Sequence, residues 1–189
     1  MAISVASRKA KGRRLQQLVA KDFSNITGIP YGKDELIESR EMGQAGNDVK
    51  LIGEAKRLLN VAVECKAQEK WSIHSFLNQA IANLGNFEDW VLICKKSRKK
   101  PIVFISEEYS KKLNICNNCR SRLFKYKPTK AWRVDKWIDE CHQVSTSDLW
   151  AASASKPGEE IVIFMDYSHY VKLLTKLVSK RQQKIFERK

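Results

Sequence analysis

Residues 46–51 read GNDVKL and residues 61–66 read VAVECK, and the second stretch has the composition of a short, buried β-strand. Successive side chains point to opposite faces of a strand, so Glu64 and Lys66 share one face while Val63 and Cys65 point into the core. Asp48 lies in the stretch before it. The predicted fold and the predicted function both depend on this pattern of Asp followed by Glu-x-Lys.

These three charged residues suit the hydrolysis of phosphodiesters. The carboxylates of Asp48 and Glu64 are hard oxygen ligands of the kind that Mg²⁺ prefers. Bound Mg²⁺ polarises a scissile phosphate and lowers the pKa of an attacking water, and Lys66 would stabilise the developing negative charge. The same short pattern also occurs as solvated residues on the outer face of an edge strand, so the flanking sequence has to decide between the two interpretations.

Three flanking segments point to one family. They read KGRRLQQ at residues 11–17, SREMGQAGND at residues 39–48 and QEKWSI at residues 68–73. Together with the central pattern they resemble phage endonucleases of the PD-(D/E)XK superfamily, in particular Holliday-junction resolvases, over roughly residues 8–113. The resemblance implies an α/β fold with a restriction-endonuclease-like core, in which a central mixed sheet is flanked by helices. It also implies a DNA substrate, branched at a junction.

The resemblance also implies roles for individual residues. Asp48 and Glu64 would be metal ligands, and the backbone carbonyl of Cys65 would be a third contact. Lys66 would be the catalytic lysine, and Gln79 matches a polar position that leans toward the site in related nucleases. The implied metal is Mg²⁺, with Mn²⁺ as a substitute.

The first helix departs from the family pattern. Many members carry a glutamate there that assists the metal or the water. Here the corresponding helix offers Gln16, Gln17 and Asp22. The identity of a third acidic ligand therefore stays open.

The charge of the chain favours a polyanionic partner. Lys and Arg number 35 against 21 Asp and Glu, which gives a formal net charge of +14. Such an excess is typical of nucleic-acid binding, although basic runs also serve to solvate turns and tails. The residues predicted to contact DNA are Arg13, Arg14, Arg40, Lys95, Lys96, Lys99, Lys125 and Lys127.

The length suits one large domain, or a core with an extension. We expect a nuclease core over residues 1–113 and a C-terminal α/β extension over residues 114–189. No apolar run approaches the roughly 20 residues of a membrane span, and the N-terminus lacks a secretory layout, so a cytoplasmic protein with reduced thiols is expected. Symmetric cutting of two strands favours a homodimer.

The extension repeats part of the core pattern. With a shift of 61 positions Trp71 aligns with Trp132, and with a shift of 60 Trp90 aligns with Trp150. A degenerate internal repeat and a chance recurrence of periodicity both explain this match. In the second copy Lys125 and Lys127 replace the Glu and Lys of the site, so a DNA clamp without metal is expected there.

A zinc site is a further possibility in the extension. Cys116 and Cys119 form a Cys-x-x-Cys pair, and Cys141 and His142 follow. Such pairs are typical of structural zinc sites, but adjacent Cys141 and His142 are an awkward pair of ligands for one ion. The alternative is ordinary thiols, in a linker and in a small core.

Two other functions fit the same core. A site-specific homing or restriction-type endonuclease would use the extension to read sequence. A non-catalytic DNA-binding protein would retain the site as a vestige. Fold does not dictate substrate, so cleavage assays with junction and linear DNA are needed to separate the three.

Overall fold

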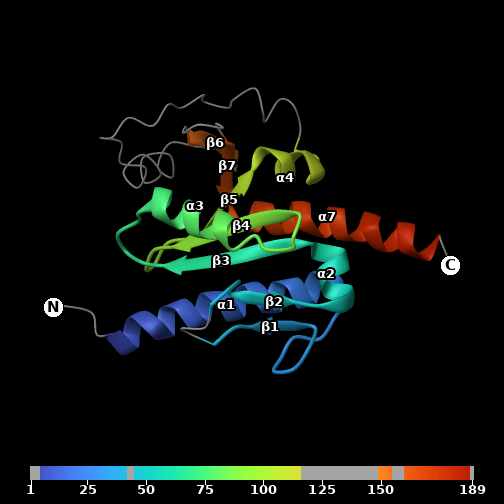
Figure 1. Ribbon diagram of the computed structural model, residues 1–189, viewed down its shortest axis with the longest axis horizontal. Helices are drawn as coiled ribbons and strands as arrows, with labels where there is room; N and C mark the ends of the chain where they lie inside the picture. The colour runs from blue at the N-terminus through green and yellow to red at the C-terminus, as the bar shows by residue number, and fades with distance from the viewer. Residues whose placement is uncertain (1–4, 42–44, 116–148, 155–159, 188–189) are drawn as a thin grey trace.

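A computed structural model describes residues 5–41, 45–115, 149–154 and 160–187 (Figure 1). The helices are α1 (Val5–Thr27), α2 (Gly53–Leu59), α3 (Ile73–Ala82), α4 (Glu107–Lys112) and α7 (Tyr167–Phe186). The strands are β1 (Ile37–Ser39), β2 (Val49–Leu51), β3 (Val61–Ala67), β4 (Asp89–Lys95), β5 (Ile102–Ser106), β6 (Leu149–Ala154) and β7 (Glu160–Asp166).

A five-stranded sheet in the order β3-β4-β5-β7-β6 forms the centre of the molecule. β3 and β4 are parallel, and the other neighbours are antiparallel. β1 and β2 form a separate antiparallel pair beside α1. The sheet is therefore mixed and flanked by helices, which confirms the predicted restriction-endonuclease-like α/β fold.

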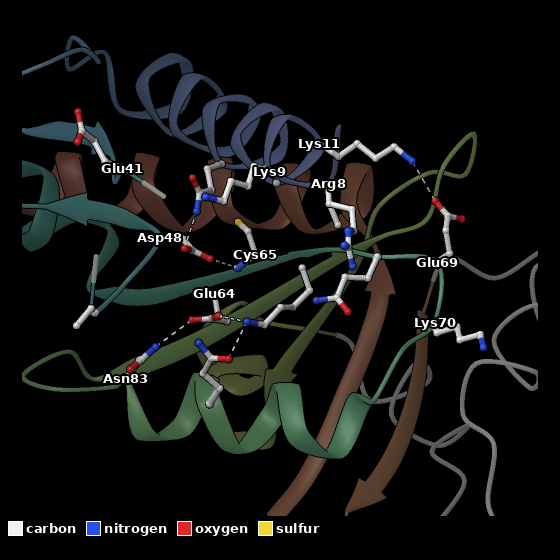
Figure 2. Close-up of a pocket in the computed structure, with 18 residues that line it drawn as sticks. Arg8, Lys9, Lys11, Glu41, Asp48, Glu64, Cys65, Glu69, Lys70 and Asn83 are labelled. Carbon is white, nitrogen blue, oxygen red and sulfur yellow. Dashed lines mark hydrogen bonds and ion pairs between the residues drawn. The ribbon is translucent and has the colours of Figure 1, made fainter. Parts of the chain in front are cut away.

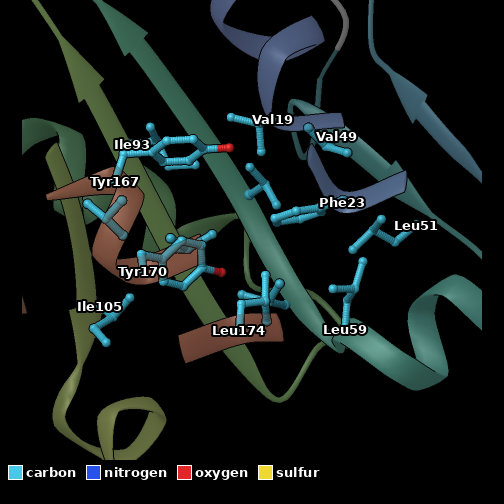
Figure 3. Packing of buried hydrophobic residues seen from close by; sticks show 14 of the residues in the cluster. Val19, Phe23, Val49, Leu51, Leu59, Ile93, Ile105, Tyr167, Tyr170 and Leu174 are labelled. Atoms are coloured by element: carbon cyan, nitrogen blue, oxygen red, sulfur yellow. The ribbon is translucent and has the colours of Figure 1, made fainter. Parts of the chain in front are cut away.

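Alternation along the strands divides the interior into two apolar layers, because successive side chains face opposite sides of a sheet. Val63, Val91 and Ile105 belong to the layer under α1 and α7. Phe104, from the opposite face, packs in the layer under α3. Figure 3 shows the first layer, where strand residues meet the aromatic and aliphatic side chains of the two helices.

α1 is amphipathic and is followed directly by a glycine. Leu15, Val19 and Phe23 recur at helical spacing and are buried in the first layer. Gly28 follows the helix with a φ of +74°, a conformation that residues with a Cβ rarely adopt. The buried side chains pack α1 against β3. The N-terminal half of α1 lies beside the C-terminal end of that strand (Figure 1).

The described part of the extension continues the core. β7 pairs with β5 in a register that sets Phe164 opposite Phe104. Tyr170, Leu174 and Val178 of α7 are buried in the layer that also holds α1. These elements therefore belong to the same sheet and the same core as β3 to β5. They do not form a second unit with a sheet of its own.

Several predictions for the extension fall outside the described residues. The lysines of the proposed clamp, Lys125 and Lys127, lie there, as do the four zinc candidates Cys116, Cys119, Cys141 and His142. Strands are present at 149–154 and 160–166, where the internal alignment expects them. Whether the whole unit is duplicated stays a prediction. Among the described residues, no helix is long and apolar enough to cross a membrane.

Candidate active site

The site forms at the open edge of β3, which has a neighbour in the five-stranded sheet on one side only. The backbone N–H of Asp48 donates to the carbonyl of Val63 at 2.8 Å. The N–H of Cys65 donates to Asp48 Oδ2 at 2.6 Å. The N–H and C=O of one residue point to the same side of a strand, so the Cys65 carbonyl is also directed toward this edge. Asp48 is thereby fixed beside the strand that carries Glu64.

Glu64 and Lys66 lie on the same face of β3, as the alternation predicts, because both contact residues at the end of α3. Figure 2 shows Glu64 beside Asn83. Lys66 Nζ lies 2.6 Å from Glu64 Oε1 and donates to Gln79 Oε1 at 2.7 Å. Asn83 Nδ2 donates to Glu64 Oε2 at 3.0 Å. The carboxylate is buried, with 3 % of Glu64 exposed. Two polar residues at the end of α3 therefore orient the glutamate and the lysine.

On α1, Gln16 is a polar residue that contacts Asp48. Its Nε2 donates to Asp48 Oδ1 at 2.6 Å, and its side chain is buried. Its Oε1 is buried without a hydrogen-bond partner. Among the polar candidates on this helix, Gln16 is therefore hydrogen-bonded to Asp48, whereas Asp22 accepts a bond from Tyr167 at 2.8 Å.

Burial and like charge act together on Asp48. Desolvation by burial and, second to it, the nearby charge of Glu64 raise the pKa of its carboxyl from 3.8 to about 6. The bonds from Cys65 and Gln16 and the charge of Lys66 oppose this shift. The site is therefore short of positive charge on the Asp48 side, which a cation would supply.

These atoms fit a hard divalent cation. The Asp48 and Glu64 carboxylates, the Cys65 carbonyl and the unpartnered Gln16 Oε1 are all oxygen donors, the class that Mg²⁺ prefers. Among the described residues, no group of three or more Asp, Glu, His or Cys side chains is arranged to hold a metal. Beside the two carboxylates, the Gln16 amide and the Cys65 backbone supply the further oxygen atoms in the described part of this site.

A cleft of about 840 Å³ opens in front of these residues. Its basic wall comes from the start of α1 and from the segment after β3, and includes Arg8, Lys9, Lys11 and Lys70. Lys11 also pairs with Glu69 at 3.4 Å across the mouth of the cleft. The cleft therefore presents acidic groups at its base and cations around them.

The predicted DNA contacts fall at different distances from this cleft. Arg14, Lys95 and Lys96 line an adjoining hollow of about 200 Å³, which shares Lys11 and Glu69 with the cleft.

The other described candidates line neither hollow. Arg13 and Lys99 are exposed. The guanidinium of Arg40 is turned inward, where it donates to the carbonyl of Ala45 and lies against Gly46. A DNA contact by Arg40 would require it to leave this loop.

Sequence reasoning missed Asn83. The signal was present, because Asn83 follows Gln79 by four residues and so lies on the same face of the helix. Gln16 had a comparable signal, as a polar residue within the buried stripe of α1.

The mixed sheet flanked by helices is consistent with a restriction-endonuclease-like fold. A family model described as "Phage putative PDDEXK endonuclease" matches residues 7–151. The chain belongs to this family of phage endonucleases. No curated protein and no solved structure matches it.

Proposed function

We propose that this nuclease hydrolyses DNA phosphodiesters with Mg²⁺, which Mn²⁺ could replace, and that it acts on branched DNA such as four-way junctions. The observation that carries the proposal is the convergence of Asp48, Glu64 and Lys66 at the base of a basic cleft. Family membership supports a nuclease, and the donor set supports a hard metal.

The protein groups have separate tasks in this proposal. Asp48, Glu64 and the Cys65 carbonyl would hold the metal, with Gln16 Oε1 beside them. Bound there, Mg²⁺ would polarise the scissile phosphate and favour ionisation of the attacking water. Lys66, steadied by Gln79 at 2.7 Å, donates to the phosphate as negative charge develops.

The basic wall of the cleft supports a DNA substrate. Lysine and arginine side chains contact phosphates and fix the register of the duplex without reading its sequence. This suits recognition of DNA by its shape, as at a junction. We further propose that the enzyme acts as a homodimer, because two symmetric cuts need two sites.

A cleavage assay separates the candidate substrates. Four-way junction, replication-fork and linear duplex DNA are incubated with the protein in Mg²⁺, in Mn²⁺ or in EDTA. We expect metal-dependent nicking with preference for the junction. Cutting of linear duplex at one fixed sequence would favour the restriction-type alternative. Tight binding with no nicking in any metal would favour the vestigial site.

A further inference from the structure

α7 carries a ridge of four lysines at four-residue intervals, made up of Lys172, Lys176, Lys180 and Lys184, which we call the α7 ridge. All four are exposed. Residues four apart are neighbours on a helix surface, so the side chains form one continuous row. At 1.5 Å per residue the row extends over about 18 Å.

The charge of this ridge is unbalanced. No Asp or Glu occurs between Tyr167 and Phe186, and within the described residues none of the four lysines forms an ion pair. Like charges at this spacing repel and destabilise a helix. A polyanion would relieve the repulsion.

The core fixes the orientation of α7. Tyr170, Leu174 and Val178 are buried on its opposite face. Arg181 donates to the carbonyl of Leu58 at 2.6 Å, so this basic residue serves the packing of the helix. The ridge therefore has a rigid backbone and a set direction, unlike a basic tail.

The ridge lies away from the catalytic cleft. Tyr167 donates to Asp22, and Gln182 donates to the carbonyl of Thr27 at 3.0 Å, so α7 runs beside the C-terminal half of α1. The cleft is lined by α1 only as far as Gln16. In Figure 1, α7 accordingly extends toward the end of the molecule opposite the start of α1.

The surface beside the ridge is hollowed. Lys176 and Lys180 line a hollow of about 380 Å³ between α4 and α7, together with Lys112. Lys112 pairs with Asp89 at 2.8 Å, whereas Lys176 and Lys180 form no ion pair within the described residues.

We propose that the α7 ridge binds the sugar–phosphate backbone of a DNA segment that is not being cut. This inference rests on the proposed function, since the segment bound by the ridge belongs to the same DNA molecule whose scissile phosphate lies in the cleft. Duplex DNA carries one negative charge per about 1.7 Å of its axis, so the ridge faces several phosphates at once. A second contact remote from the scissile bond suits a substrate with more than one arm.

The test compares two double variants with the same change in charge. Lys176→Gln with Lys180→Gln removes the middle of the ridge. Lys33→Gln with Lys50→Gln is the control, from exposed positions next to and within the β1–β2 pair that do not line the cleft. Thermal unfolding first establishes that both variants are folded. Affinity for a four-way junction is then measured in EDTA as a function of salt, and cleavage kinetics are measured in Mg²⁺.

Each phosphate contact adds about 0.9 to the slope of log affinity against log salt. We expect the ridge variant to lose about 1.8 from this slope relative to the control, with a raised KM and an unchanged kcat. A slope and a KM equal to those of the control would overturn the ridge as a DNA site, and would leave metal-dependent cleavage standing. Loss of kcat alone would equally overturn it. The proposed function is tested separately, by the dependence of cleavage on Glu64.

Discussion

At Asp48, two hydrogen bonds hold a carboxylate whose charge the surroundings disfavour. Cys65 N and Gln16 Nε2 both donate to it, yet burial and Glu64 raise its pKa to about 6. Functional sites often contain ionisable groups with shifted pKa values, and a bound cation would stabilise the charged form of this carboxylate. The loss of folding free energy caused by the ionised Asp48 carboxylate should therefore be measurable in metal-free protein.

Asp48→Asn tests this cost through the pH dependence of stability. Below pH 3.8 the carboxyl is protonated in both folded and unfolded chains. As pH rises from 3.8 to about 6, the unfolded chain ionises before the folded chain, so this group removes stability across that window, by up to about 3 kcal/mol in all. In EDTA we therefore expect the variant to become more stable relative to wild type as pH rises from about 4 to about 6, with a constant difference above that. A constant difference in unfolding free energy from about pH 4 to about pH 6 would contradict the shifted pKa.

Asn83 is expected to act by positioning Glu64. Without the bond to Oε2 the carboxylate can turn away from the site, and losses of about 10–100-fold are typical when a group behind a metal ligand is removed. We expect Asn83→Ala to lower kcat and Mg²⁺ affinity by this factor with little change in KM. Asn78→Ala is the matched control, because Asn78 is exposed on the same helix. Equal kinetics for the two variants would show that Asn83 does not position the glutamate.

At the scale of elements, the sequence predicts the individual strands and helices better than it predicts which strands pair. The strands near residues 61–66, 90–94 and 101–105 follow from apolar runs, and the helices from their spacing. The pairing of β7 with β5 does not, because a strand has the same local pattern whether it joins the first sheet or starts another. The polar contacts of Gln16 and Asn83 likewise depend on the way α1 and α3 dock onto β3.

α7 is expected to be an integral part of the core. Leu174 is fully buried in the layer shared with α1. Leu174→Ala should lower the free energy of unfolding by about 2–5 kcal/mol, because it removes apolar contacts and leaves a cavity. Ser179→Ala, on the exposed side of the helix, should change it by less than about 0.5 kcal/mol. Chemical denaturation measures both. Similar values for the two would mean that α7 packs loosely.

At the scale of the molecule, the sheet crosses the boundary predicted near residue 113. β5 lies between β4 and β7, so a chain that ended there would expose Val103 and Ile105 and lose an entire neighbouring strand. We expect residues 1–113 alone to show no cooperative unfolding transition by circular dichroism. A cooperative transition with retained nuclease activity would instead support an independent core.

The arrangement of the whole molecule places acidic residues at the base of a cleft and basic residues around and beyond it. Glu64 contacts both Lys66 and Asn83 at the end of α3. Its substitution by glutamine keeps the size and removes the charge. The chemistry and the binding of DNA should therefore separate in this one variant.

The most direct measurement is the rate of junction cleavage by wild type and by Glu64→Gln at saturating Mg²⁺, with DNA binding in EDTA measured alongside. Loss of the metal ligand removes several kcal/mol of transition-state stabilisation, so we expect cleavage to fall by about a thousandfold or more. Binding should persist, because it depends on many phosphate contacts. Undiminished cleavage by Glu64→Gln would contradict a metal-dependent nuclease site at Asp48 and Glu64.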